Sequence, residues 1–254
     1  MTSTDPLVSV IVPCYNSART LELCLRSVAD QTYAPIETIV VDDGSTDDSP
    51  AIAASLGAVV LRTGANRGPS VARNVGADHA RGDILFFLDS DVALEDTAVA
   101  TAVAALRADP ELAAVCGVYH PEPLLEPTLA ARYRSLQIAH FWMDDRGVYA
   151  SPHTSLFVIR AEVFAQVGPF HPDLRHTEPL EYGQRLRRYR HRLRFLPDVR
   201  GRHDHETTLR ELLPKVFRRA HASMLGYQRD RELGGTRSQA LSSALALAAV
   251  LTLP

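Results

Sequence analysis

The sequence predicts an α/β fold in which a mostly parallel sheet carries helices on both faces. Three observations lead to this prediction. Strand-like and helix-like segments alternate along the first part of the chain, which is typical of parallel strands joined by crossover helices. The predicted strands are continuous apolar runs, as expected for strands that are buried on both faces. Polar clusters follow three of these strands, and such sheets bind ligands at the carboxyl ends of their strands.

The first two elements are a strand and an amphipathic helix. The run VSVIVP at residues 8–13 is rich in β-branched residues and ends in proline, which favours a buried strand. Leu21, Leu25 and Val28 share one face of a helix that we predict over residues 18–31.

A second strand is predicted at residues 37–41, followed by the polar turn DDGSTDD. Pro50 then opens a helix that Gly57 ends. The next elements of this half are, in order, a short strand at 58–63, a glycine-bounded helix at 68–82, a strand at 84–88 and a helix at 98–106.

Beyond Cys116 the pattern becomes more irregular. No internal repeat and no clean linker interrupts the chain, so we expect a single domain over residues 1–237, with halves of about 7–115 and 116–237. The second half is predicted to hold a proline-rich loop and amphipathic helix at 120–142, a strand leading into a helix at 154–170, and an arginine-studded helix followed by a strand at 180–198.

Composition indicates a globular protein with unevenly distributed charge. The net charge is −3, but residues 171–237 hold sixteen basic and nine acidic residues. That segment is either a solvated surface or a face that binds phosphate groups or an anionic membrane. We expect no nucleic-acid partner.

Three widely spaced cysteines fit a reducing compartment, and the N-terminus does not resemble a signal peptide. The apolar residues 238–254 are too short to cross a bilayer and suit a membrane-associated helix or the start of a transmembrane helix.

The stretch ILFFLDSDV places two aspartates directly after a buried strand. Asp89 and Asp91 are two residues apart, so in an extended chain their carboxylates share one face and repel each other. A divalent cation would relieve this repulsion, and oxygen ligands suit Mn²⁺ or Mg²⁺. The alternative is that both aspartates stabilise the start of the next helix.

Four motifs give the sequence a resemblance to a known family. VSVIVPCYN, VVDDGSTDDS, NRGPSVARNVGADHARGDILFFLDSDV and GQRLRRYRHRLRFLPD are similar to segments of family 2 glycosyltransferases, which have the GT-A fold. The similarity is dense over the first ninety or so residues and looser over residues 157–205. It implies a Rossmann-like sheet with a nucleotide-binding half at 7–115 and an acceptor half at 116–237.

The resemblance also implies which residues bind the donor, a nucleotide diphosphate sugar. Pro13, Tyr15 and Asn16 match the loop that cradles the nucleobase, and Tyr15 offers a face for stacking unless it is a core residue. Asp42 matches the aspartate that accepts an N–H from the base edge, although it also suits a turn before Gly44.

Five further residues of the matching segments are assigned to the same donor site. Arg73 would counter a phosphate charge or pair with Asp89, and a surface salt bridge is the alternative. The others are Asp43, Arg67, Gly68 and Ser90.

The resemblance implies three metal ligands. Asp91 matches the direct ligand and Asp89 a ribose-side or metal-side aspartate, while His203, in PDVRGRHDH, matches the histidine that ends a later strand. His205 is a second candidate, and neutral imidazole joins carboxylates on Mn²⁺ readily.

The catalytic base is where this chain departs from the family pattern. The family supplies a Glu-Asp pair at the start of a helix, whereas this chain has Glu178 followed by Pro179, which cannot take a proton. The base is then Glu178, or Glu181 one helical turn further on, or it is missing. A second departure is Thr154-Ser155, where relatives often carry Gly-Asn.

The sequence thus predicts a metal-dependent, inverting glycosyltransferase that acts on an unknown hydroxyl or phosphate acceptor. Cell-envelope polysaccharide or glycolipid synthesis at the cytoplasmic face of the membrane is the expected setting. A degenerate sugar-nucleotide-binding module without a base is the alternative. A nucleotidyltransferase is disfavoured, because the chain has PCYN where such enzymes need a glycine- and lysine-rich loop, and its single lysine is Lys215.

Overall fold

The computed structural model describes residues 5–142, 152–174, 178–205, 207–208, 210–212 and 214–215 of the 254-residue chain. The apolar segment 238–254 lies outside the described residues, so the predictions made for it stay predictions. The strands are β1 (Val8–Cys14), β2 (Ile36–Asp42), β3 (Val59–Arg62), β4 (Ile84–Leu88), β5 (Val92–Leu94), β6 (Leu112–Tyr119), β7 (Leu156–Arg160) and β8 (Arg192–His203). The helices with assigned bounds are α1 (Leu21–Ala29), α2 (Ser49–Ser55), α3 (Pro69–His79), α4 (Ala98–Ala108), α5 (Leu129–Trp142), α6 (Ala161–Val167) and α7 (Glu178–Arg188).

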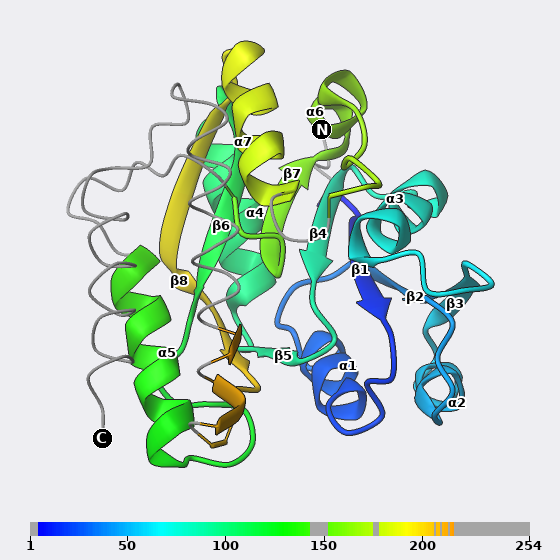
Figure 1. The fold of residues 1–254 in the computed structure, drawn as a ribbon. Helices are drawn as coiled ribbons and strands as arrows, with labels where there is room; N and C mark the ends of the chain where they lie inside the picture. The colour runs from blue at the N-terminus through cyan, green and yellow to red at the C-terminus, as the bar shows by residue number, and fades with distance from the viewer. Residues whose placement is uncertain are drawn as a thin grey trace.

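These strands form one sheet in the order β3-β2-β1-β4-β7-β6-β8-β5 (Figure 1). Among the described residues, the parallel pairs are β1–β2, β1–β4, β2–β3 and β6–β8. Strand β7 is antiparallel to both of its neighbours, β4 and β6, and β5 is antiparallel to β8. The prediction of a mostly parallel sheet is therefore confirmed.

Two strands were not predicted: β5, which lies in the first half, and β6, which crosses from the first half into the second. Strand β5 is only three residues long and follows the DSD turn at once, so no periodicity marks it. Strand β6, LAAVCGVY, is rich in small residues, which have low strand propensity. Its eight residues are nonetheless all buried, because the strand lies between β7 and β8.

The apolar strands pack against helices on both faces of the sheet. Successive residues of β4 belong to different core clusters: Phe86 packs in the cluster that includes residues of α1 and α4, and Phe87 in the cluster that includes α6 and α7. The Phe87 ring lies 5.4 Å from Phe164 and 5.1 Å from Phe170, measured between ring centroids. Alternating side chains of one buried strand thus supply both layers.

Helix α3 packs closely on the sheet because it carries glycine at the contact. A Cβ atom placed on Gly76 would lie 2.4 Å from Cγ2 of Ile11 in β1, closer than atoms can approach. This close packing sets the position of Arg73, which lies one turn earlier on α3.

Helix α1 is shorter than predicted, since residues 18–20 form a turn before Leu21.

Candidate active site

The carboxyl ends of β1, β2 and β4 meet at one edge of the sheet. Cys14 of β1 pairs with Asp42 of β2, and Ile11 pairs with Phe87 of β4, so the loops that follow these strands are neighbours. Because parallel strands end at the same edge, three separate polar clusters of the sequence come together there.

The loop after β1 is held by the loop after β2. Asn16 has a φ of 49°, in the left-handed region, and its Oδ1 accepts a hydrogen bond from the Thr46 backbone N–H at 2.8 Å. Its own N–H donates to Ser45 Oγ at 3.0 Å. Tyr15 keeps 47% of its surface exposed beside this contact, whereas Pro13 is buried inside β1. Asn16 therefore shapes the loop, and Tyr15 and Asn16 are both exposed whereas Pro13 is not.

The two aspartates at the end of β2 have different surroundings. Asp42 accepts the Ser45 N–H at 2.9 Å through Oδ1, and its Oδ2 lies 4.0 Å from Nε of the exposed Arg62. Asp43 binds the loop before α3: it accepts the backbone N–H of Arg67 at 3.0 Å and that of Gly68 at 2.7 Å. Asp43 thus orders the Arg67–Gly68 loop, and Arg67 itself is exposed at the start of α3.

Arg73 joins three elements at the centre of the site. Only 3% of its side chain is exposed. One Nη donates to Asp89 Oδ1 at 2.6 Å, and the other lies 3.6 Å from Oε1 of Glu178, which is itself buried at the start of α7. The geometry brings together the predicted donor-side aspartate and one candidate base, which lie far apart in the sequence.

The other candidate base, Glu181, has a different partner. Its two carboxylate oxygens contact Arg185 at 2.6 and 2.9 Å, four residues further along α7. This ion pair occupies the Glu181 carboxylate, whereas Glu178 faces Arg73.

Asp91 and His203 face each other across the β5–β8 pair. Asp91 Oδ2 lies 3.5 Å from Nε2 of His203, because His203 is paired with Val92 in the ladder. Asp91 Oδ1 is buried and has no hydrogen-bond partner among the described residues, although the side chain as a whole remains 43% exposed. Loss of hydration raises the pKa of Asp91, His203 acts in the opposite direction, and Asp89 raises it further.

These two side chains match the chemistry of a divalent cation in part. Two ligands of an octahedral Mn²⁺ or Mg²⁺ lie about 3 Å apart, and a carboxylate with an imidazole is a suitable pair. The predicted third ligand, Asp89, is paired with Arg73 instead. Among the described residues, no three His, Cys, Asp or Glu side chains gather closely enough to hold a metal. The structure therefore brings two of the three predicted ligands together.

Sequence reasoning missed several residues that fix the site. The Ser17 hydroxyl lies 2.8 Å from that of Ser90, which ties the loop after β1 to the DSD turn. Asp47 accepts the Ala18 N–H at 3.0 Å and the Ser49 hydroxyl at 2.6 Å. The only sequence signal for Asp47 is its place in the acidic turn DDGSTDD, and Ser17 carries none, whereas Ser90 was assigned to the donor site from the sequence.

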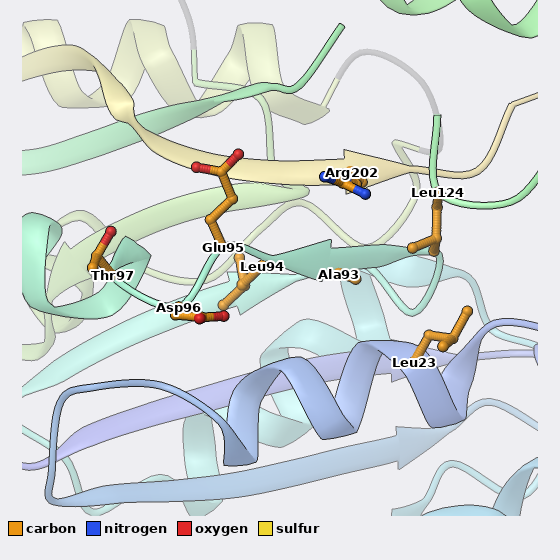
Figure 2. Close-up of a pocket in the computed structure, with 8 residues that line it drawn as sticks. All are labelled: Leu23, Ala93, Leu94, Glu95, Asp96, Thr97, Leu124 and Arg202. Atoms are coloured by element: carbon orange, nitrogen blue, oxygen red, sulfur yellow. The ribbon is translucent and has the colours of Figure 1, made fainter. Parts of the chain in front are cut away.

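A groove of about 650 Å³ opens beside this site, between α1 and the β5–β8 pair (Figure 2). Arg202 pairs with Ala93 in the ladder while His203 pairs with Val92, so Arg202 and His203 point to opposite faces. The lining is formed by Leu23, Ala93, Leu94, Glu95, Asp96, Thr97, Leu124 and Arg202. None of the residues predicted for donor, metal or base lines it, so the groove is distinct from the candidate active site.

Comparison with known proteins shows the family to which the chain belongs. Residues 9–167 match the model of the family described as Glycosyl transferase family 2. Glycosyltransferase AglE of Haloferax volcanii is 31% identical over 238 residues, which cover 91% of this chain and 77% of AglE. An uncharacterized glycosyltransferase of Haemophilus influenzae is 42% identical over 91 residues, 34% of this chain and 36% of that protein.

Two solved structures resemble the chain as well. The mannosyltransferase PcManGT from Pyrobaculum calidifontis, in complex with GDP-Man and Mn²⁺, superposes with a TM-score of 0.72 at 25% identity, covering 99% of this chain and 77% of PcManGT. TarS 1–349 of S. aureus gives a TM-score of 0.60 at 22% identity, covering 84% of this chain and 64% of TarS 1–349. The chain therefore belongs to glycosyl transferase family 2 and is a glycosyltransferase with the GT-A fold.

Proposed function

We propose that the protein is a metal-dependent, inverting glycosyltransferase that uses a nucleotide diphosphate sugar. One observation carries the proposal: both aspartates of the DSD turn have partners from distant parts of the chain. Asp91 faces His203, and Asp89 is bound by Arg73, which also lies beside the buried Glu178. The similarity to PcManGT, which is in complex with GDP-Man and Mn²⁺, supports a donor and a cation of this kind.

In this proposal the donor occupies the edge formed by the loops after β1, β2 and β4. The exposed ring of Tyr15 stacks on the nucleobase, and Asp42 accepts an N–H of the base edge. Asn16 and Asp43 act by holding their loops in shape, since backbone N–H groups occupy their side-chain oxygens.

Asp91 and His203 are the proposed protein ligands of Mn²⁺ or Mg²⁺, and Asp89 stands beside them. When bound, the cation acts as a Lewis acid that stabilises charge on the departing diphosphate. Arg73 keeps the Asp89 carboxylate in place and adds a positive charge to the donor side.

Glu178 is the proposed base. It takes the proton of the acceptor hydroxyl while the acceptor oxygen forms a bond to the anomeric carbon, and the bond from that carbon to the diphosphate breaks. Attack opposite the leaving group inverts the anomeric centre. Burial of Glu178 beside Arg73 fixes the carboxylate, so Pro179 next to it need not take part.

The acceptor and the site of action stay predictions. A hydroxyl or phosphate group of an envelope polysaccharide or glycolipid, reached from the cytoplasmic face of the membrane, is the setting that we propose. Within the part of the chain that the structure describes, no helix has the length and apolar character needed to cross a bilayer.

The test is release of nucleoside diphosphate from a panel of sugar nucleotides, with candidate acceptors, in Mn²⁺ and in EDTA. We expect turnover in Mn²⁺ that EDTA abolishes. Asp91→Ala should remove metal-dependent donor binding in calorimetry and leave the fold intact, while Asp96→Ala, an exposed aspartate nearby, should bind donor as the wild type does.

Two outcomes would contradict the proposal. Unchanged donor affinity of the Asp91→Ala variant in Mn²⁺ would reject the metal role of Asp91. Donor binding without release, for every acceptor tried, would favour a binding module whose base was lost with the proline at position 179.

A further inference from the structure

Three aromatic rings pack together at the proposed metal ligand. The His203 ring lies 4.7 Å from that of Tyr119 and 4.4 Å from that of His205, measured between centroids. His205 stacks nearly parallel to His203, at an interplanar angle of 28°, and the Tyr119 ring is inclined at 53°. His203 is therefore in ring contact with two neighbours as it faces Asp91.

The Tyr119 side chain is itself held by a buried chain of hydrogen bonds. His153 Nε2 lies 2.7 Å from the Gly117 carbonyl oxygen, so Nε2 carries the hydrogen and donates it. Nδ1 is then the acceptor, and the Ser155 hydroxyl donates to it at 2.9 Å. Ser155 Oγ in turn accepts the Tyr119 hydroxyl proton.

Every side chain in this chain of hydrogen bonds is less than a tenth exposed. The Gly117 carbonyl can only accept, so it determines which group donates at each later step. Burial lowers the pKa of His153 to about 4, so the imidazole is neutral near pH 7 and keeps this one tautomer. The Tyr119 hydroxyl therefore always donates its hydrogen bond to Ser155.

His203 needs such support because, among the described residues, its Nδ1 has no hydrogen bond that would orient the ring. A histidine that binds a metal usually donates its second ring nitrogen to a carboxylate, a carbonyl or a water. Nδ1 of His203 is buried and has no hydrogen-bond partner among the described residues. The packing of the rings is what remains to set the direction of Nε2 toward Asp91.

We infer that Tyr119 is a positioning residue for the metal site, which holds the His203 imidazole in the orientation that binds the cation. The inference rests on the proposed function, in which His203 is a ligand. Tyr119 does not touch the cation or the donor in this role. Tyr119 ends β6 and Ser155 directly precedes β7, so their hydroxyl contact fixes the Tyr119 ring beside His203 at the end of β8.

The test measures Mn²⁺ affinity from the electron paramagnetic resonance signal of free Mn²⁺, with GDP or UDP at a fixed saturating concentration. Tyr119→Leu, which removes the ring, should weaken Mn²⁺ binding roughly 10- to 100-fold, the range for losing an outer contact of a metal ligand. Tyr119→Phe keeps the ring and should restore most of this affinity. His203→Ala should weaken binding at least as much as Tyr119→Leu.

A matched control removes a buried aromatic ring elsewhere. Phe164 lies on α6 in a different core cluster from Tyr119, and Phe164→Leu should lower thermal stability without changing Mn²⁺ affinity. Loss of Mn²⁺ affinity in the Tyr119 variant but not in this control separates positioning from general destabilisation.

The outcomes divide cleanly. If His203→Ala weakens Mn²⁺ binding and Tyr119→Leu does not, the positioning role is overturned while the ligand assignment stands. If His203→Ala binds Mn²⁺ normally, the proposed ligand fails, and the role of Tyr119 fails with it. Should Tyr119→Leu not fold, Ser155→Ala replaces it: we expect an affinity about 3-fold weaker, and an unchanged value would refute the inference.

Discussion

Two glutamates one helical turn apart on α7 illustrate how surroundings decide chemistry. Glu178 is buried and lies 3.6 Å from Arg73, whereas both oxygens of Glu181 are bound to Arg185. A base has to lie within reach of the acceptor hydroxyl beside the bound donor. Glu178 is joined through Arg73 to Asp89 on the donor side, whereas Glu181 pairs with Arg185 on its own helix, so Glu178 is the better candidate.

This contrast leads to a prediction about turnover. Glu178→Gln keeps the size of the side chain and removes the basic oxygen, so we expect kcat to fall by about 10²- to 10⁴-fold with donor affinity unchanged. The matched variant Glu181→Gln should retain most of the activity. Steady-state kinetics and donor calorimetry measure both effects, and the opposite ranking would move the base to Glu181.

His153 gives a prediction about acid stability. Burial lowers its pKa to about 4, from 6.5 for the free side chain. Between these values the unfolded chain takes up a proton that the folded protein does not. The stabilisation from neutral His153 is therefore complete above pH 6.5 and lost as the pH falls toward 4, by at most about 1.4 kcal/mol per pH unit.

The measurement compares urea unfolding of the wild type and of His153→Gln at several pH values from 7.5 to 4.5. Glutamine can donate to Gly117 and accept from Ser155, but it does not titrate in this range. The variant should show a shallower fall in the free energy of unfolding. Two parallel pH profiles would mean that His153 does not cause the acid sensitivity.

At the residue level, the sequence could predict identities better than contacts. Asp89 and Asp91 are readable because they directly follow an apolar strand, and Glu178 because it begins a helix. The contact of Arg73 with Glu178 is not readable, since it depends on how α3 and α7 pack on the sheet. Tyr119 lacks any motif, and only the β6–β8 pairing brings it to His203.

At the level of elements, the α3–β1 contact is a sensitive point. Gly76→Ala places a methyl group against Ile11, and a crowded core of this kind typically loses about 1–3 kcal/mol. We expect a lower thermal midpoint and reduced activity, because Arg73 is carried on the same helix. Asp78→Ala, on the exposed side of α3, should change stability little. Equal midpoints for both variants would show that α3 can shift away from β1.

Elements with strong local signals were predicted, and those defined by tertiary contacts were not. Strands β1, β2 and β4 are apolar and β-rich in sequence, so they were found within one or two residues. Strands β5 and β6 exist because β8 and β7 lie beside them. Their sequences alone carry too little strand propensity to mark them.

At the level of the whole molecule, the order of the strands in the sheet is the feature that the sequence did not predict. Strand β7 lies between β4 and β6, so strands from the two predicted halves of the chain share one sheet (Figure 1). The alternation of elements predicted a parallel sheet, but it gave no reason to expect an antiparallel strand at its centre. That insertion follows from long-range packing, since β7 buries Phe157 and Ile159 against Phe87 and its neighbours.

The central place of β7 has a consequence for how the protein is made. Strand β4 leaves the ribosome with one side unpaired, and its partner β7 follows roughly 70 residues later, about 4 to 14 seconds at common rates of translation. During that interval an apolar strand edge is open to pairing with other nascent chains. Chaperones that shield this edge should therefore raise the yield of active protein.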